Sequence, residues 1–391
     1  MKYYFTKENI NPLQPAYCVG FAVEKEKTVK TKLDLYMRLL LLEDKDTSVL
    51  LMTLDNLCVS IDVYRQFAQV CKKKLPNTYL IITCSHTHYA PSLANEQPMN
   101  VCDEVYKNQV LLQFDYQLDK IELKEIDGYV DYHQTPFNQV GSTRISKRSD
   151  ENVYGGVLSI YDGKTRLGNI VFYNCHPTED VKDPKYFSSA YVGAGLQMLQ
   201  ESYPNEFFMF VQGSDGDASS RFTRKERSFE QTMVFGKLMS KCWSELLQRN
   251  QSTEKLVLSY KYQQYAFKAQ FKEIPVIEQA YLDSLKEAER KELLIGLEEL
   301  KKYQKMVKPT INELYLSRVS LGKYRLFFSP FELFTEYNSY IDKNTTLLIG
   351  YSNGALAYLL PVDNDEISYE YFLETTTNED KRIVVEQIKN L

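Results

Sequence analysis

The stretch that most constrains the fold is 48–88, in which two short apolar runs flank a helical pattern and the second run leads to a pair of histidines. Ser48–Leu54 and Thr78–Thr83 are short, apolar and rich in aliphatic and β-branched side chains, which predicts two buried strands. Between them, apolar residues recur at helical spacing after Ser60, a candidate N-cap, and Pro76 ends the pattern. The stretch therefore predicts a strand–helix–strand unit with parallel strands and a right-handed crossover.

The histidine pair, His86 and His88, follows the second of these strands. If the strand continues through the pair, both rings point to the same face, because side chains alternate along a strand. Imidazole is the commonest metal ligand and titrates near neutral pH, so the pair predicts a metal site or an acid–base pair. Two solvent-facing histidines in a loop are the alternative. Asp55, which ends the first strand, is expected at the same edge of the sheet.

The same pattern recurs along the chain: an apolar, strand-like run ends directly on a polar residue or turn. The other examples are His176, the turn Gly213–Ser219, Glu332 and the turn Ser352–Gly354. If these strands belong to one sheet system, their ends converge on one cleft. Three histidines and a glutamate could supply the three or four ligands that a zinc ion needs. His133 has no such setting, and we interpret it as incidental.

The turn Gly213–Ser219 allows three interpretations. Glycines between a strand and a helix can hold a phosphate on backbone N–H groups, although Asp215 and Asp217 disfavour an anion there. The turn could also be only a tight connection. As a functional element, a serine between a strand and a helix resembles a nucleophile or an oxyanion donor, and Ser219 is the candidate.

Composition excludes several classes of protein. Of the 391 residues, 43% are apolar and 25% charged, as in ordinary soluble globular proteins. The net charge of −5, without a long basic run, argues against nucleic acid as the main partner. No apolar run approaches the ~18 residues of a membrane span, and the N-terminus has no secretory h-region. The seven cysteines are scattered, without Cys-x-x-Cys, so we expect a reducing, cytoplasmic location.

The remaining patterns indicate a mixed α/β fold, with a β-sheet core flanked by helices and catalytic residues at strand ends. Hairpins are expected around Asp162-Gly163 and Leu321–Lys323. A long helix is expected over about 225–249, and a charged helix or helical hairpin over 276–307. No linker or repeat interrupts the chain, so we predict a single catalytic domain spanning 1–391.

Five motifs occur in an order that resembles the neutral/alkaline, non-lysosomal ceramidase family. The likeness starts near Asn11 and extends to about residue 375. Each motif alone is modest, but five in the right order make chance resemblance improbable. They are Ser85-His86-Thr87-His88-x-Ala-Pro, His176-Pro177-Thr178, Gln212-Gly213-x-x-Gly216-Asp217-x-Ser219, Phe331-Glu332 and Ser352-Asn353-Gly354-x-x-x-Tyr358.

The resemblance implies hydrolysis of the amide of an N-acylsphingosine at a single zinc ion per chain. It makes His86 and His176 zinc ligands, with Glu332 and Tyr358 completing the coordination. A tyrosine ligand is unusual among zinc sites, which are mostly built from cysteine, histidine and carboxylate side chains.

The resemblance also supplies four catalytic residues. Ser219 matches the catalytic serine, and His88 matches the histidine that contacts the reacting amide. Arg144 matches an arginine that binds a substrate oxygen, and Tyr369 a tyrosine near the reaction centre. Either Ser219 or a zinc-bound hydroxide would attack the carbonyl carbon, with His88 assisting proton transfer to the leaving amine.

The chain also departs from the family pattern. From its length we expect it to lack the family's C-terminal β-sandwich domain. Ser-Leu follows Pro91 where the family has Gly-Gly, and Gly-Ala-Leu-Ala follows Asn353 in place of an aromatic-bearing run. We therefore expect a zinc-dependent hydrolase of a linear amide, acting on an N-acyl lipid or a related small molecule. The alternatives are an intracellular hydrolase of a small polar amide or ester, and a non-catalytic ligand-binding member. The oligomeric state stays open.

Overall fold

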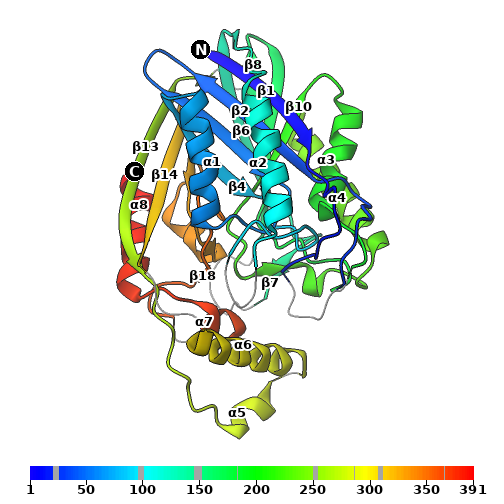
Figure 1. The fold of residues 1–391 in the computed structure, drawn as a ribbon, viewed down its shortest axis with the longest axis vertical. Coiled ribbons are helices and arrows are strands. Elements are labelled where there is room, and N and C mark those ends of the chain that lie inside the picture. Colours follow the sequence, from blue (N-terminus) through cyan, green and yellow to red (C-terminus); the bar gives the residue numbers. More distant parts are fainter. Residues whose placement is uncertain are drawn as a thin grey trace.

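Three β-sheets form the scaffold of the computed structural model, which describes residues 1–20, 26–95, 101–144, 152–182, 184–249, 254–285, 287–306, 311–364 and 366–391 (Figure 1). The first sheet has the order β4-β3-β2-β1-β5. Only β3 and β4 are parallel in it; the other neighbours pair antiparallel. Its strands are β1 (Lys2–Asn9), β2 (Tyr36–Glu43), β3 (Ser48–Leu54), β4 (Thr78–Cys84) and β5 (Lys124–Glu125).

The second and third sheets each contain one parallel pair as well. The second has the order β10-β9-β8-β6-β12, with β9 and β10 parallel, and its strands are β6 (Gly128–Pro136), β8 (Tyr154–Asp162), β9 (Thr165–Tyr173), β10 (Phe207–Gln212) and β12 (Glu254–Lys255). The third has the order β13-β14-β15-β17, with β15 and β17 parallel, and its strands are β13 (Leu258–Lys268), β14 (Ile311–Leu321), β15 (Tyr324–Phe328) and β17 (Thr346–Ile349).

Two short ribbons and the helices complete the described structure. The ribbons pair β7 (Ser142–Thr143) with β11 (Ala218–Ser219), and β16 (Glu332–Leu333) with β18 (Tyr358–Leu359). The helices are α1 (Ile61–Lys74), α2 (Glu104–Leu118), α3 (Ala190–Ser202), α4 (Phe229–Leu247), α5 (Gln279–Ser284), α6 (Glu287–Met306), α7 (Tyr369–Leu373) and α8 (Asn378–Asn390), with 3₁₀ turns η1 (Ser220–Phe222) and η2 (Thr335–Tyr340).

The inner faces of all three sheets share one apolar core. Leu51 of the first sheet, Phe172 of the second and Phe328 of the third belong to the same buried cluster. The outer face of each sheet is covered separately: α1 and α2 lie on the first, α3 and α4 on the second, and α8 on the third (Figure 1). Strands between two covered faces must be apolar on both sides, which explains the continuous apolar runs in the sequence.

Helix packing on the outer faces rests on large aromatic side chains. Phe67 of α1 meets Phe114 of α2 edge-on, with ring centroids 5.4 Å apart. Trp243 of α4 is fully buried against the second sheet, and its indole N–H donates to the carbonyl oxygen of Phe172. Burying such a side chain stabilises a fold by roughly 1.5–3 kcal/mol. These contacts fix the sheets, and with them the loops at the strand ends.

The structure confirms the predicted mixed α/β class and most of its elements. The strand–helix–strand unit is β3, α1 and β4, with the two strands parallel. The hairpins at Asp162-Gly163 and Leu321–Lys323 are both present. The long helix begins later than expected, at Phe229, because Ser228 caps it. The charged segment forms α5 and α6.

Among the described helices, none combines the length and apolar character required to cross a membrane.

Candidate metal centre and active site

The parallel strand pair of each sheet delivers residues to one site, because parallel strands end at the same edge. From the first sheet, β4 leads to His86 and His88. From the second, β9 leads to His176 and β10 to the turn that ends at Ser219. From the third, β15 leads to Glu332. The strand-end pattern in the sequence therefore corresponds to three sheets meeting at one place.

Hydrogen bonds from the loop after β17 hold these strand ends together. Asn353 accepts from the N–H of Ile82 in β4 with its side chain, and donates to the Ile82 carbonyl oxygen with its backbone. The N–H of Gly350 donates to the carbonyl oxygen of Gln212, where β10 ends. The loop that carries the Ser352–Gly354 motif thus links the third sheet to the first and the second by hydrogen bonds.

The sequence left open whether the strand continues through the histidine pair, and the structure shows that it does not. β4 ends at Cys84, and His86 has φ 60°, in the left-handed region that side chains with a Cβ rarely adopt. The rings converge because the loop turns, not because they alternate along a strand. The His86 ring stacks on the ring of Tyr351, with centroids 3.9 Å apart, and Tyr351 also has a positive φ, 54°.

Three histidines meet at the centre of the site: His86, His88 and His176. One ring nitrogen from each lies within 4.8 Å of the other two, so the three could hold one metal ion. His86 and His176 are buried, and His88 is half-buried. His133 lies elsewhere, on β6, where its Nε2 contacts the carboxylate of Asp131 at 2.8 Å. His133 is therefore separate from the histidine cluster.

Each of the three rings is oriented by a backbone carbonyl oxygen at its Nδ1. The acceptors are Leu57 at 2.9 Å for His86, Gly20 at 2.8 Å for His88, and Asp215 at 2.8 Å for His176. A carbonyl oxygen only accepts, so each Nδ1 carries the proton, and Nε2 of a neutral ring is left as a lone-pair donor. Metal-binding histidines are oriented in this way.

Gly20 is required for this arrangement. Its φ is 101°, and a Cβ at this position would lie 2.4 Å from Nδ1 of His88. Any side chain here would therefore displace the His88 ring.

A carboxylate faces the histidine nitrogens. Oε2 of Glu332 lies 3.3 Å from Nε2 of His176 and 3.9 Å from Nε2 of His86. β16 holds Glu332 directly beside Tyr358 of β18. Glu332, Tyr358, His86 and His176 are the four residues for which the resemblance implied zinc ligation, and the structure brings all four together.

Burial sets the protonation of these groups. It lowers the pKa of His86 and of His176 to about 3, and it raises the pKa of Glu332. Both rings are therefore neutral near pH 7. Two imidazole lone pairs then face a carboxyl group, which is an unfavourable arrangement unless a cation or a proton lies between them.

A buried carboxyl, Asp215, holds His176 and Tyr351. Its Oδ2 lies 3.2 Å from Nδ1 of His176 and accepts from Gln212, and its Oδ1 accepts from the hydroxyl of Tyr351 at 2.8 Å. Burial raises the pKa of Asp215 well above its ordinary value. The sequence placed Asp215 in the turn without a role, and Tyr351 was missed, although it directly precedes the Ser352–Gly354 motif.

Arg144 enters the site from β7. It is tied to the turn through its Nη2, which donates to the carbonyl oxygen of Gly216 at 2.8 Å and lies 3.5 Å from the Tyr358 hydroxyl. Its buried partner is Glu370, at 2.8 Å. No role was predicted for Glu370 from the sequence. Residues 145–151, which follow Arg144, lie outside the described residues.

Ser219 lies beside His176 through a short parallel bridge, and β11 pairs it with Ser142. It is 3% exposed, and its hydroxyl oxygen accepts from the N–H of Arg221 at 3.4 Å. Tyr369 is placed by α7, with its ring centroid 6.2 Å from that of Tyr358. Of the eight residues selected from the sequence, three form the histidine cluster, and the other five lie beside it or contact a residue that does.

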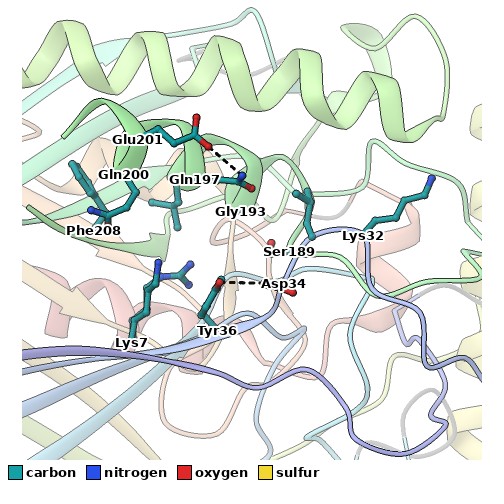
Figure 2. Close-up of a pocket in the computed structure, with 13 residues that line it drawn as sticks. Lys7, Lys32, Asp34, Tyr36, Ser189, Gly193, Gln197, Gln200, Glu201 and Phe208 are labelled. Carbon is teal, nitrogen blue, oxygen red and sulfur yellow. Dashed lines mark hydrogen bonds between the residues drawn. The ribbon is translucent and has the colours of Figure 1, made fainter. Parts of the chain in front are cut away.

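Asp55 shares the sheet edge but not the site. Its Oδ2 binds Nη1 of Arg38 at 2.8 Å, and the pair is buried within the first sheet. A hollow of about 380 Å³ between the first sheet and α3 (Figure 2) is also separate from the histidines. Lys7, Lys32, Asp34 and Tyr36 line it together with α3 residues such as Gln197. The hydroxyl of Tyr36 donates a hydrogen bond to Asp34 there, so these two polar groups of the lining already have a partner.

Comparison with known proteins gives a fold, although no family model and no curated protein sequence matches the chain. The chain is similar to the solved structure of a ceramidase in complex with C2, with a TM-score of 0.77 and 13% identity, covering 99% of this chain and 74% of that one. It is similar also to neutral ceramidase from Pseudomonas aeruginosa, with a TM-score of 0.74 and 14% identity over the same shares. The chain has the neutral ceramidase fold.

Proposed function

We propose that this protein is a zinc-dependent hydrolase that cleaves a linear amide, as ceramidases do. The observation that carries the proposal is the set of inward-facing acceptors described above. Nε2 of His86 and Nε2 of His176 each lie within 4 Å of the Glu332 carboxylate. Every Nδ1 proton is already donated to a carbonyl oxygen. Two imidazole lone pairs and a carboxylate that face one another in this way are suited to binding a cation.

The donor types fit zinc. Two imidazoles and one carboxylate are a common ligand set for catalytic zinc, which leaves one position for water or substrate. The hydroxyl of Tyr358, which lies beside Glu332, offers one further oxygen donor. When bound, zinc would polarise the amide carbonyl group and make a coordinated water acidic near neutral pH.

The remaining residues have roles that their positions support. Arg144, held by Glu370 and Gly216, would donate to an oxygen of the substrate. Ser219 Oγ or a water molecule would add to the carbonyl carbon, the C–N bond would break, and His88 would transfer a proton to the leaving amine. If Ser219 attacks, water releases the acid in a second step. The products are a carboxylic acid and an amine.

The proposal is tested by zinc content and by turnover on a panel of N-acyl amides that includes ceramide. We expect one zinc per chain by elemental analysis. We expect Ser219→Ala to keep that zinc and to lower kcat by on the order of a thousandfold. Zinc without turnover of any amide, unchanged by Ser219→Ala, would favour a ligand-binding protein. Turnover restricted to small polar amides or esters would favour the alternative function, a hydrolase of small polar substrates.

A further inference from the structure

Four cationic side chains gather beside the Ser219 turn. Arg221, Arg224 and Arg227 lie on the segment between Ser219 and α4, and Lys182 lies on the loop that follows His176. We call these four residues the arginine cluster. Arg224 contacts the side chain of Ser220, the residue after Ser219, so the cluster borders the candidate active site.

The contacts of Arg224 are neutral oxygens. Its Nη1 lies 3.3 Å from Oγ of Ser220, the residue after Ser219, and 3.4 Å from the carbonyl oxygen of Thr178. The same carbonyl accepts from Arg227 at 2.8 Å. Among the described residues, neither Arg224 nor Lys182 forms an ion pair with a carboxylate, whereas Arg221 contacts Glu292 of α6.

The members of the cluster repel one another. Burial lowers the pKa of Arg224 to about 10, with Arg227 and Arg221 adding to the effect. Burial also lowers the pKa of Lys182, and the three arginines lower it further. A carboxyl that acts electrostatically on both Arg224 and Arg227 is that of Glu179, which is fully buried. Burial raises the pKa of Glu179 to about 7, so this group is only partly charged at neutral pH. An anion entering the cluster would relieve this repulsion.

We propose that the arginine cluster binds an anionic group on the amine half of the substrate. The substrate class is then an N-acyl amino acid or N-acyl aminosulfonate, rather than an amide with a neutral head group. Guanidinium groups present paired N–H donors that match a carboxylate or sulfonate. This inference rests on the proposed amide hydrolysis and specifies which amide is cleaved.

Two soluble substrates test the inference: N-hexanoylglycine and N-hexanoylethanolamine. They share an acyl chain, differ in charge, and need no vesicle, so attraction to an anionic membrane cannot produce the result. We expect wild-type protein to prefer the glycine conjugate in kcat/KM by on the order of ten- to a hundredfold, the value of a charge-assisted hydrogen bond. Salt should reduce this preference by screening.

Arg224→Gln should lower the ratio of the two kcat/KM values by about the same factor, tenfold or more. Glutamine can still donate to Ser220 or Thr178, which protects the fold, and an unchanged unfolding temperature would confirm this. Lys225→Gln is the matched control, because it removes one positive charge from the exposed neighbouring residue. It should leave the ratio unchanged.

A wild-type preference for the ethanolamide, or an equal ratio in Arg224→Gln and wild type, would overturn the inference while amide hydrolysis stands. If neither compound is hydrolysed, calorimetric binding decides. Tighter binding of N-hexanoylglycine that is lost in Arg224→Gln would support the anion site and reject the hydrolase. Equal or absent binding of both compounds would reject the inference as well.

Discussion

The histidine centre gathers electron-pair donors and the arginine cluster gathers cations, and the two regions are built differently. In the centre, three imidazoles and a carboxylate come from the ends of strands in three sheets, and a backbone carbonyl orients each ring. In the cluster, long side chains come from two loops, and Arg224 is held by two neutral oxygens at 3.3 and 3.4 Å.

The difference indicates what each region can accept. Rings fixed by carbonyl groups leave no freedom to adjust, which suits a small cation with strict ligand distances. Guanidinium groups on long side chains retain rotamers, so they suit an anionic group whose position varies with the substrate. Removing a residue from the centre should therefore have larger effects than removing one from the cluster.

The largest effect is expected from His176→Ala. This change removes one of the inward-facing acceptors, so we expect the protein to lose its zinc and its amide hydrolysis to fall at least about a thousandfold. Elemental analysis and turnover measure the two losses. His133→Ala is the matched control, since His133 also contacts a carboxylate but lies on β6. One zinc per chain retained in His176→Ala would contradict the centre as we describe it.

A smaller effect is expected from Glu370→Gln. Arg144 would lose its buried carboxylate partner and become an uncompensated buried cation. We expect kcat/KM to fall by about ten- to a hundredfold, with zinc content unchanged, because a partner that orients a site residue has been removed.

Glu298→Gln is the control for Glu370→Gln. Glu298 pairs with Lys301 on the exposed face of α6, where such pairs contribute little. A Glu370→Asp variant separates orientation from folding, because recovered activity in it would show that the carboxylate charge itself positions Arg144. Zinc loss in Glu370→Gln would instead place Glu370 in the metal centre.

Much of the scaffold could be predicted from the sequence because both faces of the central strands are buried. Continuous apolar runs such as 48–54 and 78–83 mark such strands directly. The polar residues that follow them therefore mark strand ends, and parallel pairing brings those ends to one edge. This local logic was sufficient to select His86, His176 and Glu332.

Contacts between distant segments could not be predicted in the same way. His86 has a left-handed φ, and its ring stacks on Tyr351, which lies in the loop after β17 of the third sheet. Asp215 reads as a turn residue until the fold places His176 beside it. The arginine cluster joins Lys182 to a segment about forty residues later, and no periodicity links the two. These features are tertiary, and the sequence carries no local signal for them.

The smallest effect is expected from Glu179→Gln, which tests whether Glu179 is an ionised partner of Arg224 and Arg227. The folded-state pKa of Glu179 is raised to about 7 from an ordinary value of 4.5, so its stabilising effect is present below about pH 4.5 and is lost as the pH rises through 7. Glutamine keeps an oxygen for the N–H of Tyr191 and the hydroxyl of Thr232. Urea denaturation should show Glu179→Gln more stable than wild type by about 2 kcal/mol at pH 9, with little difference at pH 5. If the variant is instead less stable at pH 9, Glu179 is an ionised partner of Arg224 and Arg227, and the arginines need no external anion.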